Sequence, residues 1–118
     1  MEEGHIAYQA GDYDTAAQKY QTALDKLSEK SSLVPLVRYS LAKAHESKGD
    51  WDKALSDYRQ LAETSSFAGE AYLAMGRIYQ RQGKPEKEKE AYQKIVDGDL
   101  LSGPQRTMVE DKLSTLID

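Results

Sequence analysis

The sequence predicts an all-α solenoid of about seven helices arranged as antiparallel pairs, and three observations lead to this fold class. The 118 residues suffice for one domain and are too few for two that each bury a proper core. Thirteen Ala and 12 Leu outweigh 4 Val and 4 Ile, a balance that favours helices over strands. The third observation is internal repetition, because three segments of similar sequence align along the chain.

Each repeat carries a glycine and, nine residues later, a tyrosine. Both positions recur 38 residues further on in the second repeat and another 34 residues further on in the third. The glycine ends a first helix, because this position needs a left-handed backbone. A second helix then begins, with Asp12 and Asp50 as caps and Pro85 in the first turn. A small residue on the first helix lets the second approach closely, and the tyrosine fills the space beside it. The glycines are Gly11, Gly49 and Gly83, the small residues Gly4, Ala42 and Gly76, and the tyrosines Tyr20, Tyr58 and Tyr92.

Caps, breakers and apolar spacing together predict three helix pairs. The expected helices cover residues 2–10, 13–28, 33–48, 51–64, 67–82 and 85–97. Glu88 stands where the third pair should have its second small residue, so we expect that pair to be splayed or its outer helix rotated.

A seventh helix is expected over about 104–117, after the helix-start signal Ser102-Gly103-Pro104. One apolar stripe runs along it at helical spacing. Because an open solenoid end needs a helix with one apolar and one polar face, we interpret this segment as a capping helix. The alternative is an interface for a further chain. The stripe consists of Val109, Leu113, Leu116 and Ile117.

These repeats resemble tetratricopeptide repeats, whose 34-residue unit is a helix–turn–helix. The best match is Tyr72-Leu-Ala-Met75-Gly76-Arg-Ile-Tyr79, which fits the family's large-x-x-apolar-small-x-x-aromatic signature. The resemblance implies a single domain over 1–118. Because only about ten residues precede Gly11, the first helix lacks its opening turns, and we expect the chain to be a fragment of a longer protein. The repeats cover about 1–30, 35–66 and 69–100, followed by the capping helix at about 104–117.

Few residues suit catalysis or metal binding. There is no cysteine, which excludes disulfides, thiolate zinc sites and cysteine nucleophiles. The two histidines, His5 and His45, stand at different places in their repeats, and His45 is interpreted as a packed core imidazole. No metal-ligand spacing, nucleophile motif or glycine-rich phosphate loop occurs. We therefore expect no enzyme activity, no catalytic residues, no metal and no cofactor.

The charge balance narrows the class of partner. With 16 Lys and Arg against 20 Asp and Glu, the net charge of −4 and the pI near 5.2 argue against nucleic acid. No run approaches the ~20 apolar residues that span a bilayer, so we expect no direct membrane insertion by this segment. The compartment stays open, since a cytoplasmic and a bacterial envelope or periplasmic location both suit such a domain.

The resemblance also implies that the first helix of each pair lines a concave groove. Lys43 and Arg77 are one repeat apart and are expected side by side, with Arg81 one turn further along. Together with two tyrosines, these residues predict a basic strip that receives an acidic or carboxylate-bearing peptide segment. The predicted groove residues are Tyr8, Tyr39, Lys43, Glu46, Arg77, Gln80 and Arg81.

The leading functional prediction is a non-catalytic protein–protein interaction module, a scaffold or adaptor that binds a peptide segment or partner protein in this groove. One alternative is a self-association or assembly domain that forms a homo-oligomer. Another is the accessory domain of a larger enzyme or signalling protein. The identity of the partner is not predicted.

Overall fold

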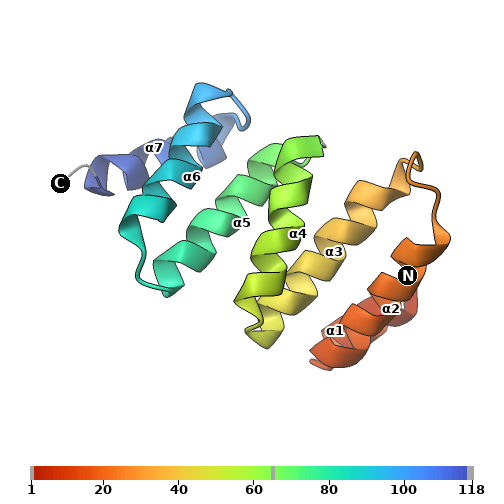
Figure 1. The fold of residues 1–118 in the computed structure, drawn as a ribbon. Coiled ribbons are helices and arrows are strands. Elements are labelled where there is room, and N and C mark those ends of the chain that lie inside the picture. The colour runs from red at the N-terminus through yellow and green to blue at the C-terminus, as the bar shows by residue number, and fades with distance from the viewer. Residues whose placement is uncertain (1, 65, 117–118) are drawn as a thin grey trace. The chain divides into compact units, whose positions relative to one another are not determined.

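The computed structural model describes residues 2–64 and 66–116, and in this part of the chain all regular structure is helical (Figure 1). Each helix begins and ends within two residues of its predicted bounds, so the all-α helical-repeat fold is confirmed. The helices are α1 (Glu2–Gln9), α2 (Tyr13–Lys26), α3 (Leu33–Lys48), α4 (Trp51–Thr64), α5 (Ala68–Arg81), α6 (Pro85–Asp97) and α7 (Gly103–Leu116).

The helices belong to two compact units, which we call unit 1 (residues 1–61) and unit 2 (residues 62–118). Unit 1 contains α1, α2, α3 and α4 as far as Leu61. Unit 2 contains the end of α4 together with α5, α6 and α7.

The turn inside each helix pair has the predicted left-handed glycine. Gly11, Gly49 and Gly83 have φ angles of +81°, +88° and +69°. In the second pair, the Gly49 N–H donates to the carbonyl of Glu46 at 3.0 Å and the Asp50 N–H donates to that of His45 at 2.9 Å. The other two turns repeat this pattern, which is the Schellman motif. Three equivalent turns therefore place three equivalent helix pairs.

The end of α6 has the same motif without a glycine at its centre. Asp99 has a φ of +53°, and its N–H donates to the carbonyl of Val96 at 3.2 Å. The next N–H, of Leu100, donates to the carbonyl of Ile95 at 2.9 Å. Aspartate tolerates the left-handed region better than most residues, which explains how the turn forms one residue after Gly98.

The predicted close approach of paired helices is also present. A Cβ atom added to Gly4 would lie 2.7 Å from Cε1 of Tyr20, and one added to Gly76 would lie 2.3 Å from Cε1 of Tyr92. The middle pair has Ala42 at this position, and both Ala42 and Tyr58 are fully buried. The small residue on each first helix thus makes room for the tyrosine on the second.

Glu88 does not open the third pair as expected. Its side chain is buried, and its carboxylate accepts a hydrogen bond from the hydroxyl of Tyr92. At this level α5 and α6 lie so close that Gly76 touches the Tyr92 ring, which contradicts a splayed pair. The carboxylate can be buried here because the hydroxyl satisfies it.

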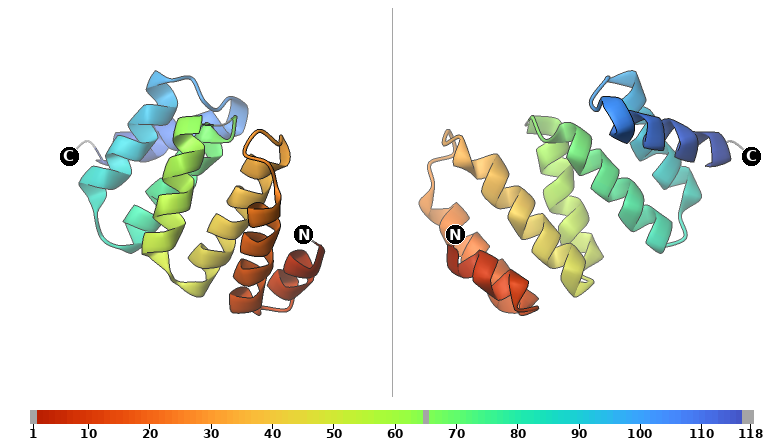
Figure 2. Two further views of the ribbon diagram at one scale, coloured as in Figure 1. Left: turned by 45° about the vertical axis from the view of Figure 1, so that its right-hand side comes forward. Right: turned by 180° about the vertical axis from the view of Figure 1, so that it is seen from behind.

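Helix α7 packs against α6 within unit 2, as Figure 2 allows the reader to follow. Its residues Val109 and Leu113 are buried against Tyr92 and Ile95, and Leu116 packs at the edge of the same cluster. Ile117, the last residue of the predicted stripe, lies outside the described residues. The apolar face of α7 therefore completes the core of unit 2.

Candidate functional site

The predicted groove residues of unit 1 centre on an aromatic and cationic cluster on α3. Tyr39 is half-buried, and its ring meets that of Tyr58 edge-on with centroids 6.0 Å apart. One turn later, Lys43 is exposed and its Nζ lies 5.8 Å from the centroid of the Tyr39 ring, within the range of a cation–π contact. This contact leaves an ammonium group at the surface beside an aromatic ring.

Tyr8 joins this surface from α1. Its hydroxyl lies 2.8 Å from Oγ of Ser47 on α3, and its ring meets Tyr13 edge-on at 5.2 Å. The hydrogen bond ties the first helices of successive pairs together, so Tyr8 has a structural role as well as an accessible hydroxyl.

Glu46 differs from the other predicted groove residues of unit 1. It is only 8% exposed, and its Oε1 accepts a hydrogen bond of 2.8 Å from the Tyr58 hydroxyl. Its carboxylate is therefore used inside unit 1, where it satisfies a buried hydroxyl.

Two exposed leucines extend the α3 surface toward the start of the helix. Leu33 and Leu36 are 49% and 41% exposed and, being three residues apart on a helix, form a small exposed apolar patch. On a helix, positions 33, 36, 43 and 47 fall within one narrow stripe. The surface thus has an apolar end and a cationic end. We call Leu33, Leu36, Tyr39, Lys43 and Ser47 the α3 face.

The remaining predicted groove residues lie on α5 in unit 2. Gln80 and Arg81 are exposed and Arg77 is half-buried. Burial raises the pKa of Tyr92 to about 12, Glu88 adds to this, and the positive charge of Arg77 acts in the opposite direction. Arg77 therefore lies close to the buried tyrosine of its own unit. That Lys43 and Arg77 lie side by side stays a prediction, because they belong to different units.

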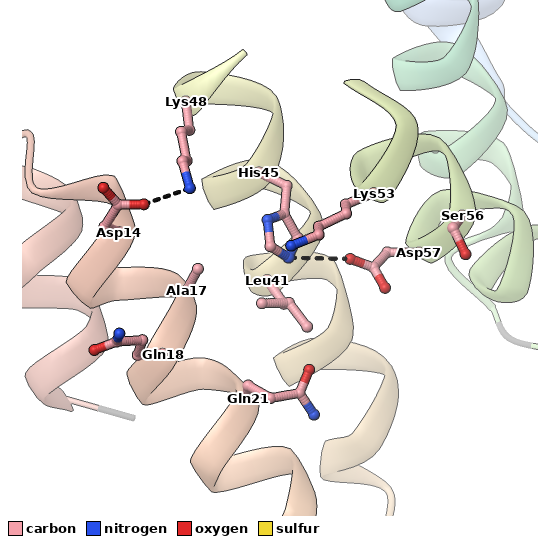
Figure 3. A pocket seen from close by; sticks show the side chains of 10 residues that line it. All are labelled: Asp14, Ala17, Gln18, Gln21, Leu41, His45, Lys48, Lys53, Ser56 and Asp57. Atoms are coloured by element: carbon pink, nitrogen blue, oxygen red, sulfur yellow. Dashed lines mark ion pairs between the residues drawn. The ribbon is translucent and has the colours of Figure 1, made fainter. Parts of the chain in front are cut away.

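Sequence reasoning missed a pocket of about 690 Å³ within unit 1, formed by α2, α3 and α4 (Figure 3). At one edge, Nζ of Lys48 lies 2.5 Å from Oδ1 of Asp14 and joins α3 to α2. Inside the pocket, Nε2 of His45 lies 3.8 Å from Oδ2 of Asp57 on α4. His45, interpreted from the sequence as a core imidazole, instead lines this pocket with 14% of its side chain exposed.

Burial dominates the electrostatics of this pocket. It raises the pKa of Asp57 to about 6, although the positive charges of Arg38 and Lys53 act to lower it. Burial also lowers the pKa of His45 below its usual value, against the effect of Asp50. The imidazole is therefore neutral at pH 7, and its buried Nδ1 has no hydrogen-bond partner.

In the described residues, no three His, Asp or Glu side chains converge as metal ligands. No helix in residues 2–64 or 66–116 combines the length and the apolar character needed to cross a membrane.

Comparison with known proteins links the whole chain to one family. A family model described as a tetratricopeptide repeat-like domain matches residues 1–118. The chain is 34% identical over 96 residues to tetratricopeptide repeat protein 12 of Mus musculus, which aligns 81% of this chain with 13% of that protein.

Two further relatives show similar identity. Small glutamine-rich tetratricopeptide repeat-containing protein 2 of Saccharomyces cerevisiae is 30% identical over 95 residues, covering 80% of this chain and 26% of that protein. Photosystem I assembly protein Ycf3 of Prochlorococcus marinus is 33% identical over 82 residues, covering 70% of this chain and 47% of that protein. The chain spans less than half the length of each of these three relatives.

Proposed function

The chain belongs to the tetratricopeptide-repeat family, and from this premise we propose that it is a non-catalytic protein-interaction module that binds an extended segment of a partner protein. The observation that carries the proposal is the α3 face, where two exposed leucines and a lysine share one stripe and the ring of Tyr39 lies beside the lysine. One relative is named as an assembly protein, which agrees with a role as a scaffold or adaptor.

The α3 face favours a segment with one apolar and one acidic side chain. Leu36 and Lys43 are seven residues apart, which is about 10 Å along a helix. A segment in the polyproline II conformation advances ~3.1 Å per residue with three residues per turn, so two side chains three positions apart lie on the same face and are ~9 Å apart. The apolar side chain would cover Leu33 and Leu36, and the carboxylate would pair with Lys43.

Within unit 2, Arg77 and Arg81 on α5 would pair with acidic side chains of a partner segment in the same way. Gln80 would offer its amide to the backbone of the segment, as side-chain amides commonly do.

The test uses labelled peptides with a leucine three positions from a glutamate, and fluorescence anisotropy as the readout. We expect Lys43→Glu to weaken binding at least tenfold, because it places two like charges together. Lys30→Glu makes the same charge change at an exposed loop position and should leave binding unaltered. Exchanging leucine for serine in the peptide should also weaken binding. Equal affinity of the Lys43→Glu and Lys30→Glu variants would contradict the proposal.

A second candidate, self-association, is favoured by one exposed residue on α1. Ile6 is 67% exposed, more than any other large apolar side chain of the described residues. A second copy that covered this face would bury it. Light scattering coupled to size-exclusion chromatography should then show a dimer that Ile6→Glu dissociates, and a monomer at every concentration would exclude this candidate.

A further inference from the structure

The pocket formed by α2, α3 and α4 lies away from the α3 face. His45 and Lys43 are two residues apart, so their side chains leave α3 about 200° apart. A ligand of the pocket therefore makes no use of Lys43, and the two surfaces can be tested separately.

The carboxylate of Asp57 is the least satisfied charged group in this pocket. Its side chain is only 16% exposed, and no hydrogen bond reaches it from the described residues. The nearest basic atom, Nε2 of His45, is 3.8 Å away, which is too far for a hydrogen bond. Removing a carboxylate from water without supplying donors is costly, so a ligand that brings donors to it is favoured.

The rest of the lining suits a long side chain with a donor-rich head. Leu41, which is 2% exposed, forms part of the apolar wall, and Ala17 lies opposite on α2 (Figure 3). The side-chain amides of Gln18 and Gln21 add acceptors on the α2 side. Lys48 is already paired with Asp14 and contributes little net charge.

We propose that this pocket binds an arginine side chain of a partner protein, with the guanidinium paired to the carboxylate of Asp57. The planar guanidinium presents two parallel N–H groups that match the two carboxylate oxygens. Its aliphatic stem lies along Leu41 and Ala17. The neutral imidazole of His45 accepts a further N–H at Nε2, the ring nitrogen that faces Asp57.

Charge complementarity favours this occupant over an anion. Of the positive charges near Asp57, the Lys53 ammonium is 67% exposed, and the Arg38 guanidinium donates to Oε1 of Gln60 at 2.5 Å instead of to Asp57. A carboxylate ligand would meet the buried Asp57 at close range and be repelled. The charged groups that surround the two side chains are Asp14 on α2, Arg38 and Lys48 on α3, and Asp50 and Lys53 at the start of α4.

The pairing requires an ionised Asp57, which makes the affinity depend on pH. With the pKa of Asp57 at about 6, affinity should be about tenfold lower at pH 5 than at pH 8. Protonation of His45 at low pH acts in the same direction, because it adds a positive charge beside the guanidinium.

The experiment is an NMR titration of the isotope-labelled chain with Nα-acetylarginine methylamide. We expect amide shifts at residues 14–21, 45–48 and 53–57, and a fall in the pKa of the Asp57 carboxyl when the probe is bound. Asp57→Asn should weaken binding at least tenfold, whereas Asp52→Asn, an exposed carboxylate on the same helix, should leave it unaltered. Nα-acetyllysine methylamide should bind several-fold more weakly, because an ammonium cannot form the paired contact.

Unaltered arginine binding in Asp57→Asn, or shifts confined to other surfaces, would overturn the proposal. Equal binding of the lysine probe would overturn the assignment of a guanidinium. Lys43→Glu should leave the titration unchanged, and a loss there would assign the probe to the α3 face instead.

Discussion

Replacing Gly76 with alanine tests the packing rule that holds each helix pair together. The added Cβ would lie 2.3, 2.7 and 2.9 Å from Cε1, Cζ and Cδ1 of Tyr92. Ordinary carbon contacts are ~3.5–4.0 Å, so the ring must move. Tyr92 is 1% exposed and its hydroxyl donates to Glu88, which leaves the ring no open direction.

The expected loss of stability follows from two opposing effects. Overpacking of a buried site costs ~1–3 kcal/mol, and the severity of this overlap places the cost at the upper end. Alanine in place of a helical glycine returns ~1 kcal/mol. We therefore expect Gly76→Ala to lower the free energy of unfolding by about 2 kcal/mol, as measured by urea denaturation followed by circular dichroism.

A second background separates the clash from the helix propensity. In a Tyr92→Leu variant the clashing ring atoms are gone, so Gly76→Ala should become neutral or stabilising by up to ~1 kcal/mol. The change of sign is the diagnostic result. If Gly76→Ala has the same effect in both backgrounds, the glycine is not required for the approach of the tyrosine, and the packing rule is wrong.

Two further predictions concern unit 1. The pKa of Asp57, raised to about 6, means that the folded state holds this proton more tightly than the unfolded state between about pH 4 and pH 6. The contribution of Asp57 to stability therefore falls as pH rises through that window. Asp57→Asn should be ~2–3 kcal/mol more stable than the parent at pH 7 and about as stable as the parent at pH 4. Parallel pH profiles of the two proteins in urea denaturation would contradict this. Gly49→Ala should cost ~1–2 kcal/mol, because φ is +88° and no atom lies near enough for a clash, so the cost is backbone strain alone. Gly49→Asn should lose less, since asparagine tolerates this conformation, and equal losses would point to another cause.

The helix bounds could be predicted because each repeat signals its own turn. A glycine that must be left-handed recurs at Gly11, Gly49 and Gly83, and the side chain of Asp12 caps α2 by accepting from the N–H of Thr15. Such signals act within a few residues and are visible in the sequence. The pairing of small residues with tyrosines was predictable for a related reason, since both positions recur at equivalent places in every repeat.

Features that depend on contacts between unlike positions were not predictable in this way. Gly69 lies at the start of α5, where an added Cβ would be 2.6 Å from the carbonyl oxygen of Leu100. Neither residue belongs to the shared repeat pattern. The left-handed turn at Asp99 was also missed, because glycine is the residue expected at such a position and Gly98 stands one residue earlier.

The candidate sites show the same difference between residues that the repeat pattern identifies and residues that it does not. Tyr8, Tyr39 and Lys43 could be named in advance because the resemblance says which stripe of a first helix is left unpacked, although it could not show that Glu46 turns inward to Tyr58. The pocket was not foreseen because His45 occupies the aromatic place of its repeat.

A histidine in that place fills less space than a tyrosine and keeps two polar nitrogens. Asp57, from the next helix, then stands beside the ring at a distance too long to satisfy either group. Neither residue signals a site on its own, and only their approach within unit 1 leaves polar groups without partners in an open pocket. In a helical repeat, a polar residue at a packing position is thus the place to search for a site that the repeat pattern does not describe.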